Sequence, residues 1–197
     1  MIYEKVIFII PGFKHQSGNK AYVNIANILK NEKYFPILID IPWKNSTITE
    51  NTIYFLKIYK KIKARKKYIL GFSYGAMIAF IASTKVRSSG LILCSLSPYF
   101  KEDISKTNNK TLSLLMTKRY EDFSRLHCAM LAKNIKAKKI LMLYGAEEEK
   151  SLIRRVTDAF DKISSKQKHL IKISKTEHEI GNKRYLNTIH QAARELL

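Results

Sequence analysis

Cysteine, glycine and proline are scarce in this chain of 197 residues, which contains 2 Cys, 7 Gly and 4 Pro. Two cysteines are too few for a disulfide scaffold. Neither Cys94 nor Cys128 has the sequence spacing of a metal site, so both are expected to be reduced. The low Gly and Pro content excludes a collagen-like repeat, and a hydrophobic content of 46% excludes intrinsic disorder. These features predict one globular domain over residues 1–197.

Long hydrophobic runs are also absent. The apolar stretch near the N-terminus covers only residues 6–10, which is too short for a signal peptide or a membrane-spanning helix. Together with the reduced cysteines, the absence of a transmembrane segment favours a cytoplasmic location.

Acidic residues are few: 16 Asp and Glu against 36 Lys and Arg give a formal net charge of +20. Such an excess attracts acidic partners, which include nucleic acid, anionic membranes and acidic proteins. A competing explanation is codon bias, because the chain is rich in Lys, Ile, Asn and Tyr, which AT-rich coding favours. We find no helix-turn-helix or other nucleic-acid-binding module, which argues against nucleic acid as the partner.

Short runs of β-branched and aliphatic residues alternate with longer segments of helical periodicity. The predicted strands are residues 6–10, 36–40, 68–70, 91–94, 140–144 and 170–173. The predicted helices are residues 21–29, 53–64, 76–84, 152–163 and 184–197. Because this alternation is typical of βαβ units, it predicts an α/β fold with about six, mostly parallel strands and helices on both faces of the sheet.

Residues 99–137 interrupt the alternation. This stretch has no convincing strand and a helical pair around residues 112–116 and 123–131, which predicts a small helical cap inserted into the domain. The apolar residues of the insertion either line a substrate pocket or form its packing face; they are Leu112, Leu115, Met116 and Phe123.

The strongest local motif is Gly71-Phe72-Ser73-Tyr74-Gly75, which lies between the predicted strand 68–70 and the predicted helix 76–84. Small residues two positions before and after Ser73 allow a sharp, strained turn that exposes the serine hydroxyl. A helix that begins directly after the serine aims backbone N–H groups at a developing oxyanion. The alternative interpretation is a tight strand-to-helix turn with an incidental serine.

On this motif and its flanking elements, the chain resembles the α/β-hydrolase family over nearly its whole length. In that family, an acid after the next-to-last core strand and a histidine after the last strand follow the nucleophile. Both positions are filled, by Glu148, which is three residues after Gly145, and by His178. The resemblance therefore implies a catalytic triad of Ser73, Glu148 and His178. Glu147 remains an alternative to Glu148, because a one-residue shift in the loop would exchange the two.

The resemblance also implies an oxyanion hole formed by the backbone N–H groups of Phe13 and Tyr74. Family members usually have His-Gly before the first donor, whereas this chain has Pro11-Gly12. Further substrate contacts are expected from the same loop and from the insertion, namely Gly12, Lys14, His15 and Met116. For the Lys14 and His15 side chains, simple exposure to solvent is an equally good explanation. The chain starts at the position of the family's third strand, so a minimal sheet is expected.

These expectations lead to two functional hypotheses. The first is a serine hydrolase that cleaves a carboxylic ester or thioester through an acyl-enzyme, with no metal or organic cofactor. Its substrate is a small acyl ester or thioester, and the positive charge adds the hypothesis of acyl groups carried by an acidic acyl-carrier protein. The alternative is a hydrolase-fold protein with weak catalysis that acts as a basic binding module for an acidic partner.

Overall fold

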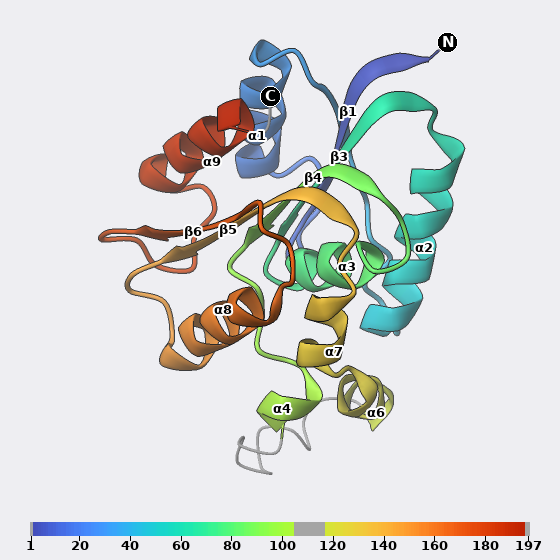
Figure 1. Ribbon diagram of the computed structural model, residues 1–197, viewed down its shortest axis with the longest axis vertical. Helices are drawn as coiled ribbons and strands as arrows, with labels where there is room; N and C mark the ends of the chain where they lie inside the picture. The colour runs from blue at the N-terminus through green and yellow to red at the C-terminus, as the bar shows by residue number, and fades with distance from the viewer. Residues whose placement is uncertain (1, 105–116, 196–197) are drawn as a thin grey trace.

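The computed structural model describes residues 2–104 and 117–195, and the fold is given for these residues (Figure 1). Their six strands form one sheet in the order β2-β1-β3-β4-β5-β6, and each strand is parallel to its neighbours. The strands are β1 (Tyr3–Ile10), β2 (Phe35–Leu38), β3 (Ala64–Phe72), β4 (Ser88–Cys94), β5 (Ala137–Gly145) and β6 (Lys168–Ile173). The predicted α/β fold with six parallel strands is confirmed.

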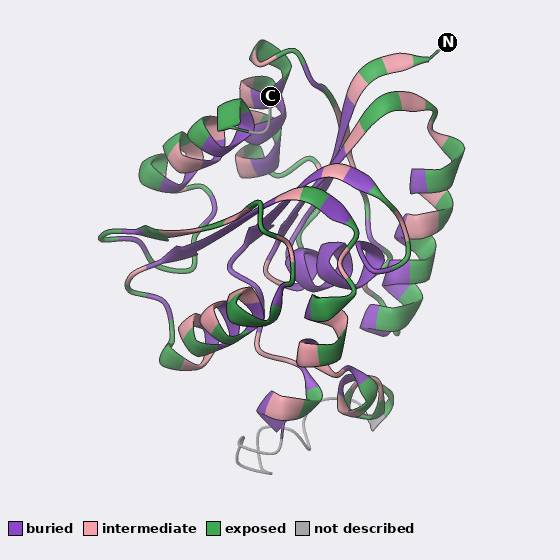
Figure 2. Cartoon of the chain, in the orientation of Figure 1, coloured by how far each residue is buried: buried purple, intermediate pink, exposed green. Residues whose placement is uncertain are grey.

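Helices cover both faces of the sheet, as predicted (Figure 1). On one face lie α1 (Lys20–Asn31) and α9 (Lys183–Glu195), which contact each other. On the other face lie α2 (Ile48–Lys61), α3 (Tyr74–Ala82) and α8 (Lys150–Lys162). All nine residues of α3 are buried, so this helix crosses the centre of the molecule (Figure 2).

The alternation of side chains along β1 divides the core into two layers. Ile7 and Ile9 pack under α1 and α9, whereas Phe8 and Ile10 pack with α2 and α3. Because both faces of a parallel sheet are covered, its central strands are apolar over their carboxyl-terminal halves, as in residues 6–10, 68–72 and 140–144. This burial explains why the strands read as continuous apolar runs in the sequence.

Most element boundaries lie within three residues of the prediction, and the starts of α2 and β3 differ by more. α2 begins at Ile48 rather than at residue 53, because Thr47 and Glu50 form a capping box in which each side chain accepts the other's backbone N–H. β3 begins at Ala64 rather than at residue 68, because its backbone pairs with β1 as far as Tyr3. The basic residues 65–67 are therefore part of a strand and not of a loop.

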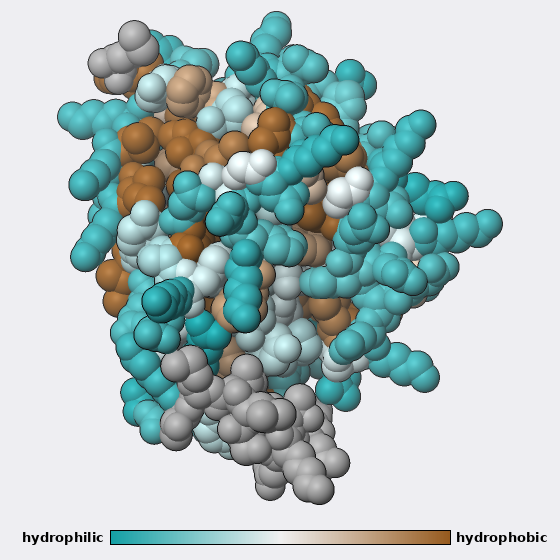
Figure 3. Space-filling model, turned by 180° about the vertical axis from the view of Figure 1, so that it is seen from behind, coloured by the Kyte–Doolittle hydropathy of each residue, from teal (hydrophilic) through white to brown (hydrophobic). Residues whose placement is uncertain are grey.

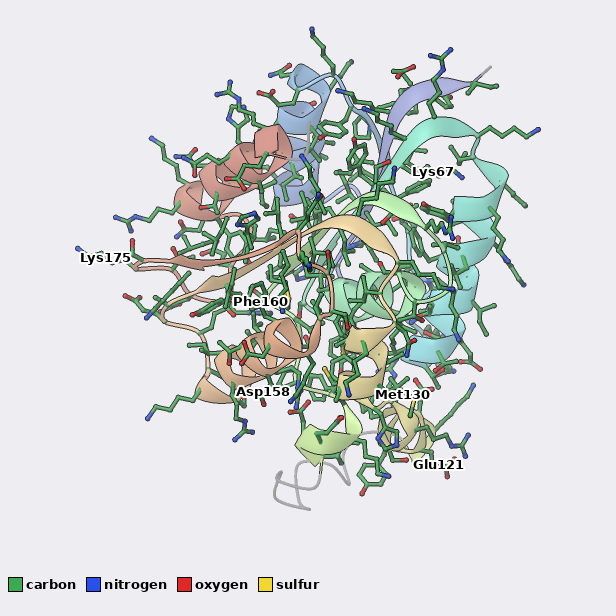
Figure 4. All side chains as sticks on the ribbon, in the orientation of Figure 1. Lys67, Glu121, Met130, Asp158, Phe160 and Lys175 are labelled. Carbon is green, nitrogen blue, oxygen red and sulfur yellow. The ribbon has the colours of Figure 1, made fainter. Side chains whose placement is uncertain are left out.

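Some of the lysines have a structural role at the ends of helices. Lys67 Nζ donates a hydrogen bond of 2.8 Å to the Tyr59 carbonyl in the last turn of α2 (Figure 4). Lys168 Nζ donates bonds of 2.7 Å to the carbonyls of Phe160 and Ile163 at the end of α8. A cation at a helix C-terminus satisfies carbonyls that lack partners within the helix and interacts favourably with the helix dipole. Part of the positive charge therefore stabilises the fold.

Hydrophilic side chains cover most of the face seen in Figure 3, and apolar patches lie between them. Lys175, at the turn after β6, projects away from the body of the protein (Figure 4). Within residues 2–104 and 117–195, no helix combines the length and the apolar character that a membrane crossing requires.

The stretch 99–137 contains three helices in its described part: α4 (Lys101–Ile104), α6 (Thr117–Arg125) and α7 (Cys128–Lys133). The predicted continuous helix over residues 123–131 is wrong. It is broken before Cys128, where the Glu102 carboxylate accepts the N–H groups of Cys128 and Ala129 and so starts a new helix. The predicted helix at 112–116, with Leu112, Leu115 and Met116, lies outside the described residues.

A buried ion pair attaches this stretch to the rest of the protein. Asp103 on α4 and Arg155 on α8 form hydrogen bonds of 2.6 to 3.1 Å, and both side chains are about 5% exposed or less. Phe123, predicted either to line a pocket or to pack, has no exposed surface and stacks on Tyr99 at 5.3 Å. Its role is packing.

Candidate active site

Ser73 occupies a strained turn between β3 and α3. Its backbone has φ 55° and ψ −118°, a combination that residues other than glycine seldom adopt. A Cβ at Gly71 would lie 2.3 Å from the Gly75 carbonyl oxygen, and a Cβ at Gly75 would lie 2.2 Å from the Ile10 carbonyl oxygen. Both distances are too short for any side chain, so the two glycines of the motif are required by the close approach of the backbone.

Ser73 and His178, which are 105 residues apart, are brought together at the carboxyl ends of β3 and β6. His178 Nε2 lies 3.0 Å from Ser73 Oγ. The ring of His178 stacks on Phe72, with 4.8 Å between the ring centroids. This stacking holds the imidazole against the residue that precedes the serine.

Glu148 lies beside the Nδ1 atom of His178. Its Oε1 lies 3.6 Å from His178 Nδ1, and its side chain has no exposed surface. Glu147, the alternative, is exposed. A Cβ at Gly145 would lie 2.2 Å from the Thr176 carbonyl oxygen, so Gly145 allows the Glu148 loop to meet the His178 loop. The separation of 3.6 Å is longer than a hydrogen bond, and such contacts often shorten when substrate binds.

The backbone N–H groups of Phe13 and Tyr74 have the freedom that an oxyanion hole needs. Neither N–H donates a hydrogen bond within residues 2–104 and 117–195. Tyr74 is the first residue of α3, where the positive end of the helix dipole lies. The neighbouring Gly12 N–H donates a bond of 2.9 Å to the hydroxyl of Tyr22, which has no exposed surface. Tyr22 thereby anchors the loop that carries Phe13.

Tyr22 also determines which ring nitrogen of His15 carries the proton. Because Tyr22 Oη already accepts from Gly12, its own proton is available for His15 Nδ1 at 2.8 Å. This bond leaves the proton of a neutral His15 on Nε2. Burial, with a contribution from His178, lowers the pKa of His15. His15 is therefore neutral at pH 7.

Three polar residues of the site were not predicted from the sequence, namely Ser95, Ser97 and Tyr185. Ser97 Oγ lies 3.0 Å from Ser73 Oγ, and Ser95 Oγ lies 2.5 Å from Glu148 Oε1. The hydroxyl of Tyr185, on α9, lies 2.7 Å from Ser95 Oγ. The sequence signal that was available is the pair of serines directly after the apolar run of β4, at the carboxyl edge where parallel strands carry their functional groups.

A cavity of about 370 Å³ opens beside Ser73 and His178. Its walls are mainly aromatic and apolar, and its other lining residues are Gly12, Phe13, His15, Phe72, Tyr74, Ser97, Pro98, Tyr99, Glu149 and Leu152. Of the four predicted substrate contacts, Gly12 and His15 line this cavity. Lys14 lines a neighbouring one of about 710 Å³ that shares His15, and Met116 lies outside the described residues.

The overall arrangement was compared with known proteins. No family model and no curated protein matches the sequence. Among solved structures, Est1E from Butyrivibrio proteoclasticus with ferulic acid bound has a TM-score of 0.83 at 15% identity, covering 98% of this chain and 88% of that chain. Alpha/beta hydrolase domain-containing protein 10 from mouse has a TM-score of 0.74 at 15% identity, covering 97% and 88%. The chain has the α/β-hydrolase fold. A monoacylglycerol lipase from Paleococcus ferrophilus is also similar, with a TM-score of 0.77 at 16% identity, covering 99% and 96%.

The α/β-hydrolase fold confirms the resemblance inferred from the Gly71–Gly75 motif. In this chain, the fold presents Ser73, Glu148 and His178 on three loops that follow β3, β5 and β6. No group of three His, Cys, Asp or Glu residues in the described part of the chain is arranged to hold a metal ion.

Proposed function

We propose that the protein is a serine hydrolase that cleaves a carboxylic ester or thioester through an acyl-enzyme on Ser73. The observation that carries this proposal is the distance of 3.0 Å between Ser73 Oγ and His178 Nε2 at a strained strand-to-helix turn. The buried Glu148 beside His178 Nδ1 supports it. A serine becomes nucleophilic when an oriented base accepts its proton.

The proposed reaction has two halves. In the first, Ser73 Oγ attacks the acyl carbon while His178 Nε2 takes the hydroxyl proton, and His178 then returns this proton to the departing alcohol or thiol. In the second, His178 takes a proton from a water molecule as that water attacks the acyl-enzyme, and His178 then returns the proton to Ser73 Oγ as the acid leaves. Glu148 stabilises the imidazolium that forms in both halves and holds Nδ1 protonated.

The negative charge on the acyl oxygen is stabilised by the N–H groups of Phe13 and Tyr74 in this mechanism. Each such donor is worth about 3 kcal/mol in the transition state. The absence of hydrogen bonds from these groups to the described protein residues supports the assignment. Tyr22 and Gly12 keep the Phe13 loop in position through a bond that the substrate does not need to break.

The cavity supports a small ester as the substrate. A volume of about 370 Å³ with aromatic walls at Phe13, Tyr74 and Tyr99 fits a compact apolar or aromatic acyl group. Proteins of similar fold include a monoacylglycerol lipase and an Est1E structure with bound ferulic acid. This similarity favours an ester substrate.

A second candidate is an acyl group carried by an acidic protein, and the observation in its favour is the net charge of +20. Opposite charge increases the association rate of such a partner. The lysines that cap α2 and α8 account for only part of the excess.

The decisive experiment for the proposed function is labelling with a fluorophosphonate, followed by intact-mass spectrometry. A single adduct is expected on the parent protein and none on Ser73→Ala. Ser88→Ala is the matched control, because Ser88 is also a buried serine but lies at the opposite end of β4. A folded parent without an adduct, or an adduct that persists in Ser73→Ala, would exclude Ser73 as the nucleophile.

A further inference from the structure

A row of buried polar groups leads from α9 to the carboxylate of Glu148. Ser95 follows β4 directly, and its Oγ lies 2.5 Å from Glu148 Oε1. Tyr185 Oη lies 2.7 Å from Ser95 Oγ. Ser95 and Tyr185 have no exposed surface, and neither does the Glu148 side chain. None of these three residues lines the cavity beside Ser73.

The chemistry of the three groups determines which one donates. An ionised carboxylate can only accept, so the Ser95 hydroxyl donates to Glu148. Ser95 Oγ then accepts the proton of Tyr185, whose pKa is raised well above its usual value by burial, so the phenol stays protonated. The Leu143 carbonyl lies 3.4 Å from Tyr185 Oη, which is beyond a good hydrogen bond, and the Cys94 side chain is a further neighbour.

Glu148 depends on this row for its polar contacts. Its Oε2 is buried and has no hydrogen-bond partner within residues 2–104 and 117–195, and its Oε1 is 3.6 Å from His178 Nδ1. The shortest contact of the carboxylate is therefore the Ser95 hydroxyl. A buried carboxylate without hydrogen bonds is strongly destabilised in its charged form.

The backbone at Ser95 is also unusual. Its φ of 51° lies in the left-handed region that favours glycine. A serine at this position adopts a strained backbone and brings a hydroxyl to the carboxylate. Such strain at a buried position typically accompanies a functional requirement.

We propose that Ser95, with Tyr185 behind it, is a positioning residue that holds the Glu148 carboxylate aligned with His178. This inference rests on the serine-hydrolase mechanism proposed above. Ser95 acts on the reaction only through Glu148, because it lines neither the cavity beside Ser73 nor the neighbouring one. Its loss should therefore lower kcat and leave KM unchanged.

The test measures kcat and KM for a small aryl ester. Ser95→Ala should lower kcat by about tenfold, because it removes a hydrogen bond to a charged group. Tyr185→Phe should lower kcat by a smaller factor, since it removes the donor one step away. Ser88→Ala and Tyr34→Phe are matched controls: each removes a hydroxyl from a buried residue away from Glu148, and each should retain the parent kcat.

A double-mutant cycle separates positioning from a structural role. If Ser95 acts through the charge of Glu148, Ser95→Ala should lower kcat by less than about twofold in a Glu148→Gln background. Ser95→Gly adds a second check, because it removes the hydroxyl and the backbone strain together. It should have a melting temperature no lower than that of Ser95→Ala, yet the same reduced kcat.

Two outcomes would overturn the inference alone: parent-like kcat in both Ser95 variants, or a tenfold loss that persists in the Glu148→Gln background. A folded parent protein that neither hydrolyses esters nor reacts with a fluorophosphonate would instead overturn the proposed function, and this inference with it.

Discussion

Ser73 and Ser95 directly follow two neighbouring strands, and both have a positive φ, of 55° and 51°. Each continues the hydrogen bonding of the sheet by one residue: Ser73 N donates to the Cys94 carbonyl at 2.9 Å, and Ser95 N donates to the Leu143 carbonyl at 2.8 Å. One hydroxyl contacts His178 and the other contacts Glu148. The sheet edge thus holds both ends of the proposed triad.

The strain at Ser73 predicts opposite effects on stability and activity. Ser73→Gly should be more stable than Ser73→Ala by about 1 kcal/mol or more, because glycine adopts this backbone without a Cβ clash. Both variants should lose ester hydrolysis by at least about 1000-fold. Denaturant unfolding and initial rates measure the two effects. Equal stability of the two variants would contradict a strained turn.

Gly75 should tolerate no side chain. Gly75→Ala would place a Cβ 2.2 Å from the Ile10 carbonyl oxygen, and we expect a loss of at least about 3 kcal/mol or a failure to fold. Gly18→Ala is the matched control, because a Cβ at Gly18 meets no atom within 4 Å. Chemical denaturation of both variants tests the difference, and a Gly75→Ala protein as stable as the control would refute it.

Arg155 should contribute strongly to stability. Arg155→Met leaves the buried Asp103 carboxylate without its guanidinium, and removal of one partner of a buried ion pair costs about 3 to 5 kcal/mol. Arg154→Met, at the exposed neighbouring position of α8, should change the free energy of unfolding by less than about 0.5 kcal/mol. Similar urea midpoints for the two variants would show that the pair is not stabilising.

Glu32 should make stability depend on pH. Hydrogen bonds from His190 and Arg194 on α9 lower the pKa of its carboxyl group. A carboxyl group whose pKa is lower in the folded than in the unfolded state stabilises the protein at pH values above its unfolded-state pKa. This stabilisation is lost as the pH falls through the folded-state pKa. Glu32→Gln should therefore lower the melting temperature near neutral pH, by an amount that shrinks progressively below about pH 4.5.

Melting curves from about pH 3 to 7 for the parent and Glu32→Gln measure this difference. Glu4→Gln, which alters an exposed ion pair with Arg65, should have little effect on the melting temperature at any of these pH values. A Glu32→Gln difference that stays constant with pH would contradict the assignment.

The carrier-protein hypothesis predicts a selective effect of salt. Turnover of an acyl group on an acidic carrier should fall by about tenfold between roughly 50 and 500 mM salt, because screening weakens the attraction between the two proteins. Turnover of an uncharged aryl ester should stay within about twofold over the same range. An equal salt response for the two substrates would remove the carrier protein from consideration.

The sequence by itself determined the α/β fold and the order in which the proposed nucleophile, acid and histidine follow one another. The apolar runs and the helical periods show which residues of each segment are buried, and this information is local to the segment. The Gly71–Gly75 motif indicates a turn that only small residues can form. The boundaries of α2 and β3 were predicted less well. The Thr47–Glu50 capping box in the sequence indicates where α2 begins, whereas the start of β3 depends on backbone pairing with β1.

Only the tertiary structure decided which polar groups surround the site. Glu148 rather than Glu147 lies beside His178 because Gly145 lets two loops meet closely. Tyr185 reaches Ser95, 90 residues away in the chain, because α9 packs against β5 and β6 on one face of the sheet. Such contacts depend on strand order and helix packing, which are set by the whole core at once. Local periodicity contains no information about them, because it reports the burial of a residue and not its partner.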